Sequence, residues 1–77
     1  MSKQLHTARH KRLMAALVAV RQDAGITQRE LARRLKRAHS YVGRIEQGIR
    51  RLDVAEFIEW CECLDTDPIT VFRRVVG

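Results

Sequence analysis

The apolar positions of this chain recur at the spacing of amphipathic helices rather than of strands. An apolar face with steps of three or four residues predicts a first helix from about Arg12 to Ala24, formed by Leu13, Leu17, Val20 and Ala24. Gly25 follows at once, and glycine commonly ends a helix because it takes the left-handed conformation without steric cost. Alternation of apolar and polar residues, which marks a half-buried strand, is nearly absent. The chain is therefore expected to be all-α.

The segment from Thr27 to Gly48 predicts two short helices joined by a turn of about three residues, the pattern of a helix-turn-helix. Thr27 and Glu30 have the spacing of a capping box, in which each side chain accepts a hydrogen bond from the other residue's backbone N–H. Each helix has its own apolar stripe, the first made of Leu31, Ala32 and Leu35 and the second of Ala38, Val42 and Ile45. The second of the two is expected from about His39 to Gln47. Helices this short are not stable alone, so both stripes must share a core with the rest of the chain.

Two further helices are expected after this segment. Asp53 and Glu56 form a second capping-box pattern at the start of the fourth helix. Its core-facing positions are predicted to be Val54, Phe57, Ile58, Cys61 and Leu64, with Trp60 at the edge of the core. Asp67 as cap and Pro68 at the first position begin a fifth helix. This helix has more apolar residues than one face can bury, which suggests a self-association surface made of Ile69, Val71, Phe72 and Val75.

Charge is distributed unevenly along the 77 residues. Residues 1–52 carry thirteen Lys or Arg and three acids, a net charge of +10, whereas residues 53–77 carry a net charge of −4. An ordinary solvated surface would mix the two signs along the chain. A polyanionic partner that approaches from one side fits this separation better.

Residues 1–11 are polar and basic, and they are expected to form a flexible arm ahead of a single domain at 12–77. A basic arm could lie along phosphates or enter a minor groove, or it could be a tail that aids solubility, and the sequence leaves both open. His6 and His10 have the spacing of a helical metal pair, but a zinc site needs three or four ligands. No metal and no cofactor are expected.

Several other classes of protein are disfavoured. No run of 18 apolar residues and no signal peptide is evident, so we expect a cytoplasmic protein without a membrane span. Cys61 and Cys63 are two residues apart and would face different sides of a helix, which favours reduced thiols over a disulfide. There is no nucleophile–base arrangement and no Gly-rich phosphate loop, so an enzyme with a small-molecule substrate is not expected.

The segment 27–48 resembles the helix-turn-helix of the phage Cro and lambda-repressor type, also called the Xre family. The residues that carry the resemblance are Thr27, Gln28, Leu31, Ala32, Leu35, Val42, Ile45, Glu46 and Gly48, with Arg21 and Gly25 upstream. It extends from about Leu13 to Phe72. The resemblance implies a five-helix lambda-repressor-like domain whose partner is double-stranded DNA.

The resemblance also implies roles for single residues. Base edges would be contacted by His39, Ser40, Gly43 and Arg44, and the Arg44 fork matches the O6 and N7 acceptors of guanine. The DNA backbone would be contacted by Gln28, Lys36, Arg37, Gln47, Arg50 and Arg51. Arg21 and Glu46 would form a structural ion pair. Lys36 stands where many members of the family have glycine, because the residue after that helix often has a positive φ.

The expected function is that of a transcriptional regulator, a repressor that binds a palindromic operator as a homodimer and is associated with the nucleoid. The two reading helices would then enter successive major grooves about 34 Å apart. An antitoxin or another protein-binding module with the same fold is the alternative. A flexible acidic tail after the fifth helix would favour the antitoxin, and the sequence ends at Gly77. The regulator is therefore preferred.

Overall fold

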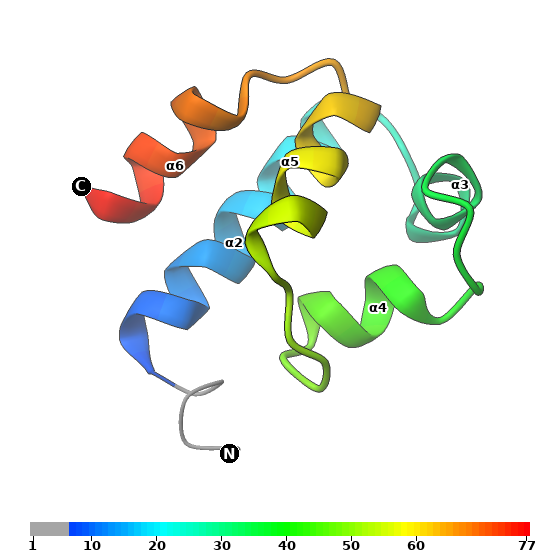
Figure 1. Cartoon of the computed structure of the whole chain (residues 1–77), viewed down its shortest axis with the longest axis horizontal. Coiled ribbons are helices and arrows are strands. Elements are labelled where there is room, and N and C mark those ends of the chain that lie inside the picture. The colour runs from blue at the N-terminus through cyan, green and yellow to red at the C-terminus, as the bar shows by residue number, and fades with distance from the viewer. Residues whose placement is uncertain (1–6) are drawn as a thin grey trace.

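The computed structural model describes residues 7–77, which form five helices around one core (Figure 1). They are α2 (Ala8–Asp23), α3 (Gln28–Arg34), α4 (Tyr41–Glu46), α5 (Val54–Cys63) and α6 (Pro68–Val76). Within residues 7–77 no strand occurs. The prediction of an all-α, five-helix domain is confirmed.

The core is built where α2 and α5 lie against the other helices. α2 contacts α4, α5 and α6, and α3 packs on α4 and α5. The largest side chains that are fully buried come from all five helices: Trp60, Leu17, Leu31, Ile45, Val42, Val71 and Cys61. Trp60, expected at the edge of the core, lies inside it. Because α3 and α4 each give buried side chains to this shared core, two helices of seven and six residues are stable in the domain.

The helix boundaries follow the caps. α2 begins four residues before the expected position because the Thr7 hydroxyl accepts a hydrogen bond from the His10 backbone N–H at 3.1 Å. Residues 8–11, expected in the arm, are therefore the first turn of a helix, while residues 1–6 of that arm, with His6, lie outside the described residues. α4 begins at Tyr41, two residues later than expected, and Ser40 makes no side-chain cap.

In both predicted capping boxes, the side chain of the cap residue accepts the expected backbone hydrogen bond. The Thr27 hydroxyl accepts from the Glu30 N–H at 3.0 Å, but the Glu30 carboxylate accepts instead from Arg33 and Arg34 one turn further on. At α5 the box is complete, because Asp53 and Glu56 each accept from the other's backbone N–H.

The predicted self-association surface needs correction at Val71 and Val75. Their side chains face the core, with exposed fractions of 0% and 7%. Ile69, Phe72 and Val76 occupy the outer side of α6 and are exposed by 57–65%. Two stripes of one helix cannot both face the same core, and the stripe of positions 71 and 75 is the one that α2 and α5 cover.

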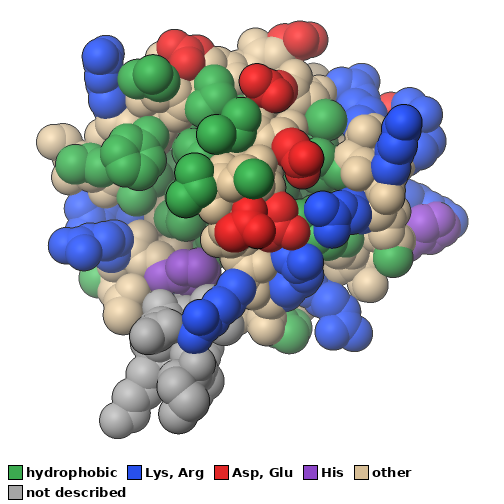
Figure 2. Space-filling model, viewed as in Figure 1, with side chains coloured by type: hydrophobic (Ala, Val, Ile, Leu, Met, Phe, Trp, Pro, Cys, Tyr) green, Lys and Arg blue, Asp and Glu red, His purple; other side chains and the backbone are tan. Residues whose placement is uncertain are grey.

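Two residues of α5 are corrected in the same way. Val54 and Ile58, one turn apart, were expected in the core and are exposed by 76% and 39%. Phe57, Trp60, Cys61 and Leu64 form the buried side of that helix. Together with the outer stripe of α6, the exposed residues form an apolar area that Figure 2 shows over α5 and α6.

Candidate nucleic-acid interface

The burial of α4 decides which of its residues face outward. Val42 and Ile45 are fully buried and fix the rotation of the helix against α2 and α3. His39, Ser40, Arg44 and Gln47 are consequently exposed, and Gly43 is partly buried. All four predicted base-reading residues therefore lie in or just before one short helix whose inner side is anchored in the core.

Arg21 and Glu46 form the ion pair that the resemblance implied. Arg21 Nε donates to Glu46 Oε2 at 2.7 Å and Arg21 Nη2 donates to Oε1 at 3.0 Å, a two-pronged contact. Arg21 Nη1 also donates to the Ile26 carbonyl at 2.9 Å. The exposed fractions of the two side chains are only 11% and 6%. The pair therefore joins the end of α2, the loop before α3 and the end of α4.

Gln28 extends this network to the surface. Its amide Nε2 donates to Glu46 Oε1 at 2.8 Å, across from the start of α3 to the end of α4. The same side chain lies over Gly43, where an added Cβ would be 3.3 Å from Gln28 Oε1. The absence of a side chain at position 43 thus leaves room for the Gln28 amide, a reason that the sequence alone did not indicate.

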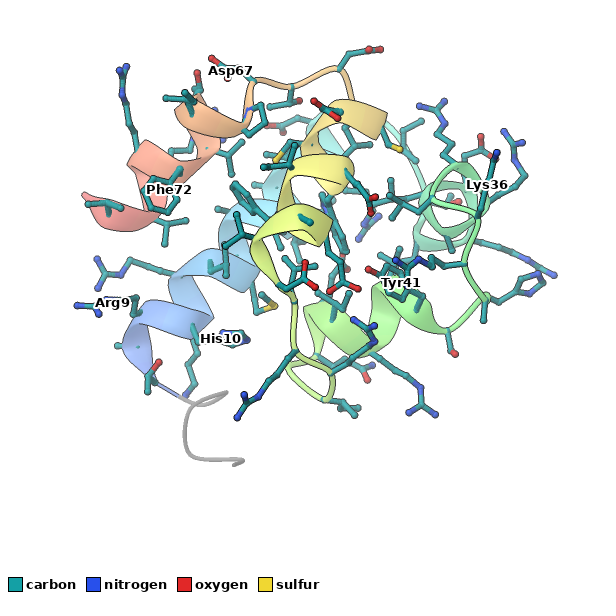
Figure 3. The ribbon with its side chains drawn as sticks, viewed as in Figure 1. Arg9, His10, Lys36, Tyr41, Asp67 and Phe72 are labelled. Atoms are coloured by element: carbon teal, nitrogen blue, oxygen red, sulfur yellow. The ribbon has the colours of Figure 1, made fainter. Side chains whose placement is uncertain are left out.

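The turn between the two helices holds a strained basic residue. Lys36 has φ of +58°, in the left-handed region that favours glycine. The family pattern of glycine at this position is explained by that conformation. The Lys36 side chain points away from the domain at the edge of α3 (Figure 3), and the exposed Arg37 follows it in the same turn.

A second cluster of charged residues surrounds Tyr41 at the beginning of α4. The guanidinium carbons of Arg37 and Arg50 each lie 4.8 Å from the centre of the Tyr41 ring, a distance typical of cation–π contacts. Arg50 donates from Nη1 and Nη2 to the two Glu56 oxygens at 3.2 and 3.1 Å. Arg37 Nη2 is 3.7 Å from Glu56 Oε2. Sequence reasoning missed this cluster, because its members come from the turn, α4, the following loop and α5.

The electrostatics of this cluster follow from those contacts. The hydrogen bonds from Arg50 lower the pKa of Glu56, although partial burial of the carboxylate acts in the opposite direction. Burial and the nearby Glu56 carboxylate raise the pKa of Tyr41, so its hydroxyl stays protonated well above neutral pH. Glu56 therefore remains ionised and Arg50 remains paired under ordinary conditions.

Other basic residues of the positively charged segment, residues 1–52, lie on the surface. Arg51 is exposed in the loop before α5. Arg33 and Arg34 are held by Glu30 on α3, and these hydrogen bonds lower the Glu30 pKa to about 2. Figure 2 shows many of the Lys and Arg side chains on the side opposite to the apolar area, with acidic side chains between the two.

An apolar groove of about 600 Å³ lies away from the helix-turn-helix, between the beginning of α2, α5 and α6. Leu13, Val54, Phe57, Ile58, Ile69 and Phe72 supply most of its walls, and Arg9 and Asp53 supply charged groups at its edge. Phe72, labelled in Figure 3, meets Phe57 edge to face with ring centres 6.4 Å apart. This groove contains the exposed apolar residues of the self-association surface.

The part of the chain that the structure describes offers two free thiols but no group of metal ligands. Cys61 is a free, buried thiol whose pKa burial raises to about 11, and Cys63 is a free, half-buried one. Among residues 7–77 no three His, Cys, Asp or Glu side chains gather as metal ligands. None of the five helices is at once long and apolar enough to cross a membrane.

Comparisons with known proteins agree with this geometry. A family model described as a helix-turn-helix domain matches residues 3–71. An XRE-family like protein from Pseudomonas syringae pv. tomato superposes with a TM-score of 0.87 at 43% identity, over 96% of this chain and 90% of that one. Two structures of the clp gene regulator ClgR from Corynebacterium glutamicum superpose with TM-scores of 0.81. They share 27% and 26% identity, over 92% and 94% of this chain and 76% and 94% of theirs. A search among curated proteins gives no match.

Proposed function

Because the chain belongs to the Xre family of helix-turn-helix proteins, we propose that it is a DNA-binding transcriptional regulator, a repressor that binds a palindromic operator as a homodimer. The proposal takes its support from one observation above the others. Arg44 lies on the exposed side of α4, and the exposed His39 and Ser40 directly precede this helix, while its opposite side is fixed in the core. A rigidly held helix with polar side chains outward has the properties needed to enter a major groove.

In this proposal the residues divide into two groups. Arg44, Ser40, His39 and Gly43 face base edges, and the Arg44 fork donates to the O6 and N7 atoms of guanine. Gln28, Lys36, Gln47, Arg51 and, in part, Arg37 face phosphates, which positions the protein without reading sequence. Arg50, expected in this group, donates to Glu56 instead. Arg21 and Glu46 hold α4 in place behind them. A protein that works on the chromosome in this way would be cytoplasmic and associated with the nucleoid.

The homodimer is proposed on the corrected apolar surface. Ile69 and Phe72 of α6, with Val54 and Ile58 of α5, line one groove, and all four side chains are exposed. Val76 of α6 is exposed as well. Neighbouring exposed apolar side chains of this kind mark association surfaces. A two-fold interface brings the same patch of each subunit together, so a ridge next to a groove can serve both subunits. The patch lies away from the helix-turn-helix, which leaves both reading helices accessible.

The base-reading role is tested on DNA selected from a random pool by the wild-type protein. Arg44→Ala should weaken binding to the selected duplex by about 1–3 kcal/mol and relax base choice at one position. Arg73→Ala, which removes the same charge from α6, is the control and should keep the wild-type base preferences. An equal loss on every sequence would remove Arg44 from the base-reading group, and selection that yields no common sequence would oppose the regulator itself.

A further inference from the structure

The Glu56 carboxylate occupies the hydrogen-bonding fork of an arginine that was expected to bind DNA. Both terminal nitrogens of Arg50 donate to Glu56, and Nη1 also donates to the Arg51 carbonyl at 2.8 Å. The Glu56 side chain is only 12% exposed, whereas those of Arg37 and Arg50 are 38% and 39% exposed. Glu56 therefore lies beneath the two guanidinium groups, which are themselves open to solvent on one side.

A phosphate cannot take the Nη1–Nη2 edge of Arg50 without displacing this carboxylate, and at the remaining Nε–Nη2 edge it would meet a guanidinium whose charge Glu56 already neutralises. Displacement would leave a largely buried charge with fewer partners, and unpaired buried charges are costly. The Asp53 N–H and the capping of α5 hold Glu56 in place independently of Arg50, so the carboxylate cannot easily follow the arginine outward. The Tyr41 ring limits the arginines from a second direction, because both guanidinium carbons lie 4.8 Å from its centre.

We propose that Glu56 is an internal counter-ion that stands in for a DNA phosphate and withholds Arg50, and in part Arg37, from the DNA backbone. This inference rests on the proposed function, since it concerns how tightly the same interface holds DNA of any sequence. Non-specific affinity comes almost entirely from phosphates neutralised by Lys and Arg. Withholding one or two cations lowers the affinity for DNA of any sequence and leaves the contacts of Arg44 with base edges unchanged, so base contacts make up a larger share of operator binding.

The test compares Glu56→Gln with the wild type on a mixed-sequence duplex of about 20 base pairs, with binding measured by fluorescence anisotropy from about 50 to 200 mM salt. Glutamine keeps an oxygen that can accept the Asp53 N–H, so the α5 cap can persist. Glu59→Gln removes the same charge from an exposed position of α5 and is the matched control. Thermal melts followed by circular dichroism show whether each variant is folded.

Glu56→Gln should bind the mixed-sequence duplex more tightly than Glu59→Gln. A plot of its log K against log salt should be steeper by about 0.9 for each phosphate newly contacted. The gain in affinity over the wild type should therefore be about threefold larger at about 50 mM than at about 200 mM salt. In the Arg50→Ala background the effect of Glu56→Gln should shrink. Equal slopes for Glu56→Gln and Glu59→Gln would overturn the proposal, and a shallower slope would mean that Glu56 positions the arginines for DNA instead.

A second measurement applies even if Glu56→Gln does not fold. Arg50→Ala alone should leave the salt slope of the wild type unchanged, because Arg50 is already neutralised by Glu56. A slope reduced by about 0.9 would show that Arg50 contacts a phosphate and would overturn the counter-ion role. If the wild type binds no duplex even at low salt, the proposed function fails. That result differs from a changed or unchanged salt slope, because a slope can be measured only when the wild type binds DNA.

Discussion

Replacement of Arg21 by methionine should be among the most damaging single changes in the domain. Methionine keeps much of the side-chain length but removes all three hydrogen bonds that Arg21 donates, two to Glu46 and one to the Ile26 carbonyl. Glu46, with a side chain only 6% exposed, would keep the Gln28 amide at 2.8 Å as its one hydrogen-bond partner among residues 7–77. The change therefore leaves a nearly buried carboxylate without its counter-charge.

Removing one partner of a buried ion pair costs about 3–5 kcal/mol. A domain of this length, at 0.05–0.15 kcal/mol per residue, has a total free energy of unfolding of about 4–12 kcal/mol. Arg21→Met should accordingly remove a large part of the stability. Arg21→Met combined with Glu46→Leu should be more stable than Arg21→Met alone, because the second change removes the stranded charge.

Urea unfolding of the wild type, both single variants and the double variant gives the coupling energy directly. A strong pair predicts that the double variant loses much less free energy of unfolding than the sum of the two single losses. A loss below about 1 kcal/mol for Arg21→Met, or strict additivity of the two changes, would show that the pair contributes little to stability. The pair would then behave like an exposed one, against its geometry and burial.

Three further predictions concern other parts of the molecule. Lys36→Gly should raise the free energy of unfolding by about 1 kcal/mol over Lys36→Ala in urea titrations, because both remove the same charge and only glycine relieves the left-handed strain; equal stabilities would show that the turn is unstrained. Phe72→Glu should give monomers in sedimentation whereas Arg73→Glu should not, and a wild type that is already monomeric at high concentration would contradict the dimer. Glu56 has a lowered pKa in the folded state, so its stabilising effect is complete above the unfolded value near 4.5 and is lost as the pH falls through the folded value. Acid unfolding curves of Glu56→Gln should therefore fall less steeply below about pH 4.5 than those of the wild type, and identical curves would mean that the Arg50 contact contributes little.

Much of the fold could be predicted because local signals and apolar periodicity agree over most of the chain. Thr27, Asp53 and Asp67 each cap the helix that was expected to begin there, and Gly25 and Gly48 have the positive φ expected of helix stops. The start of α2 was missed for a physical reason. Its first turn, Ala8 to Lys11, has no acidic partner for the Thr7 cap and no apolar residue larger than alanine, so neither signal marks it.

The outer side of α6 could not be predicted because its sequence contains two apolar stripes. Val71 and Val75 are four residues apart on one side, whereas Ile69, Phe72 and Val76 are three and four residues apart on another. Either stripe alone would make an acceptable core face, so periodicity cannot choose between them. Only the position of α2 against α6 decides that positions 71 and 75 are buried.

The charge distribution along the sequence predicts that the partner is a polyanion, but it does not predict how many cations contact that partner. Net charge governs long-range attraction, and residues 1–52 carry +10 whatever their local pairing. The salt dependence of binding instead counts only the cations that touch phosphates. Arg21 is held by Glu46, Arg33 and Arg34 by Glu30, and Arg50 by Glu56. Arg37 also lies 3.7 Å from Glu56, so within residues 7–77 three carboxylates hold at least five arginines. Such a domain can be drawn to DNA as a strongly basic protein yet hold any one stretch of it through a smaller set of side chains, and the sequence cannot show which ones.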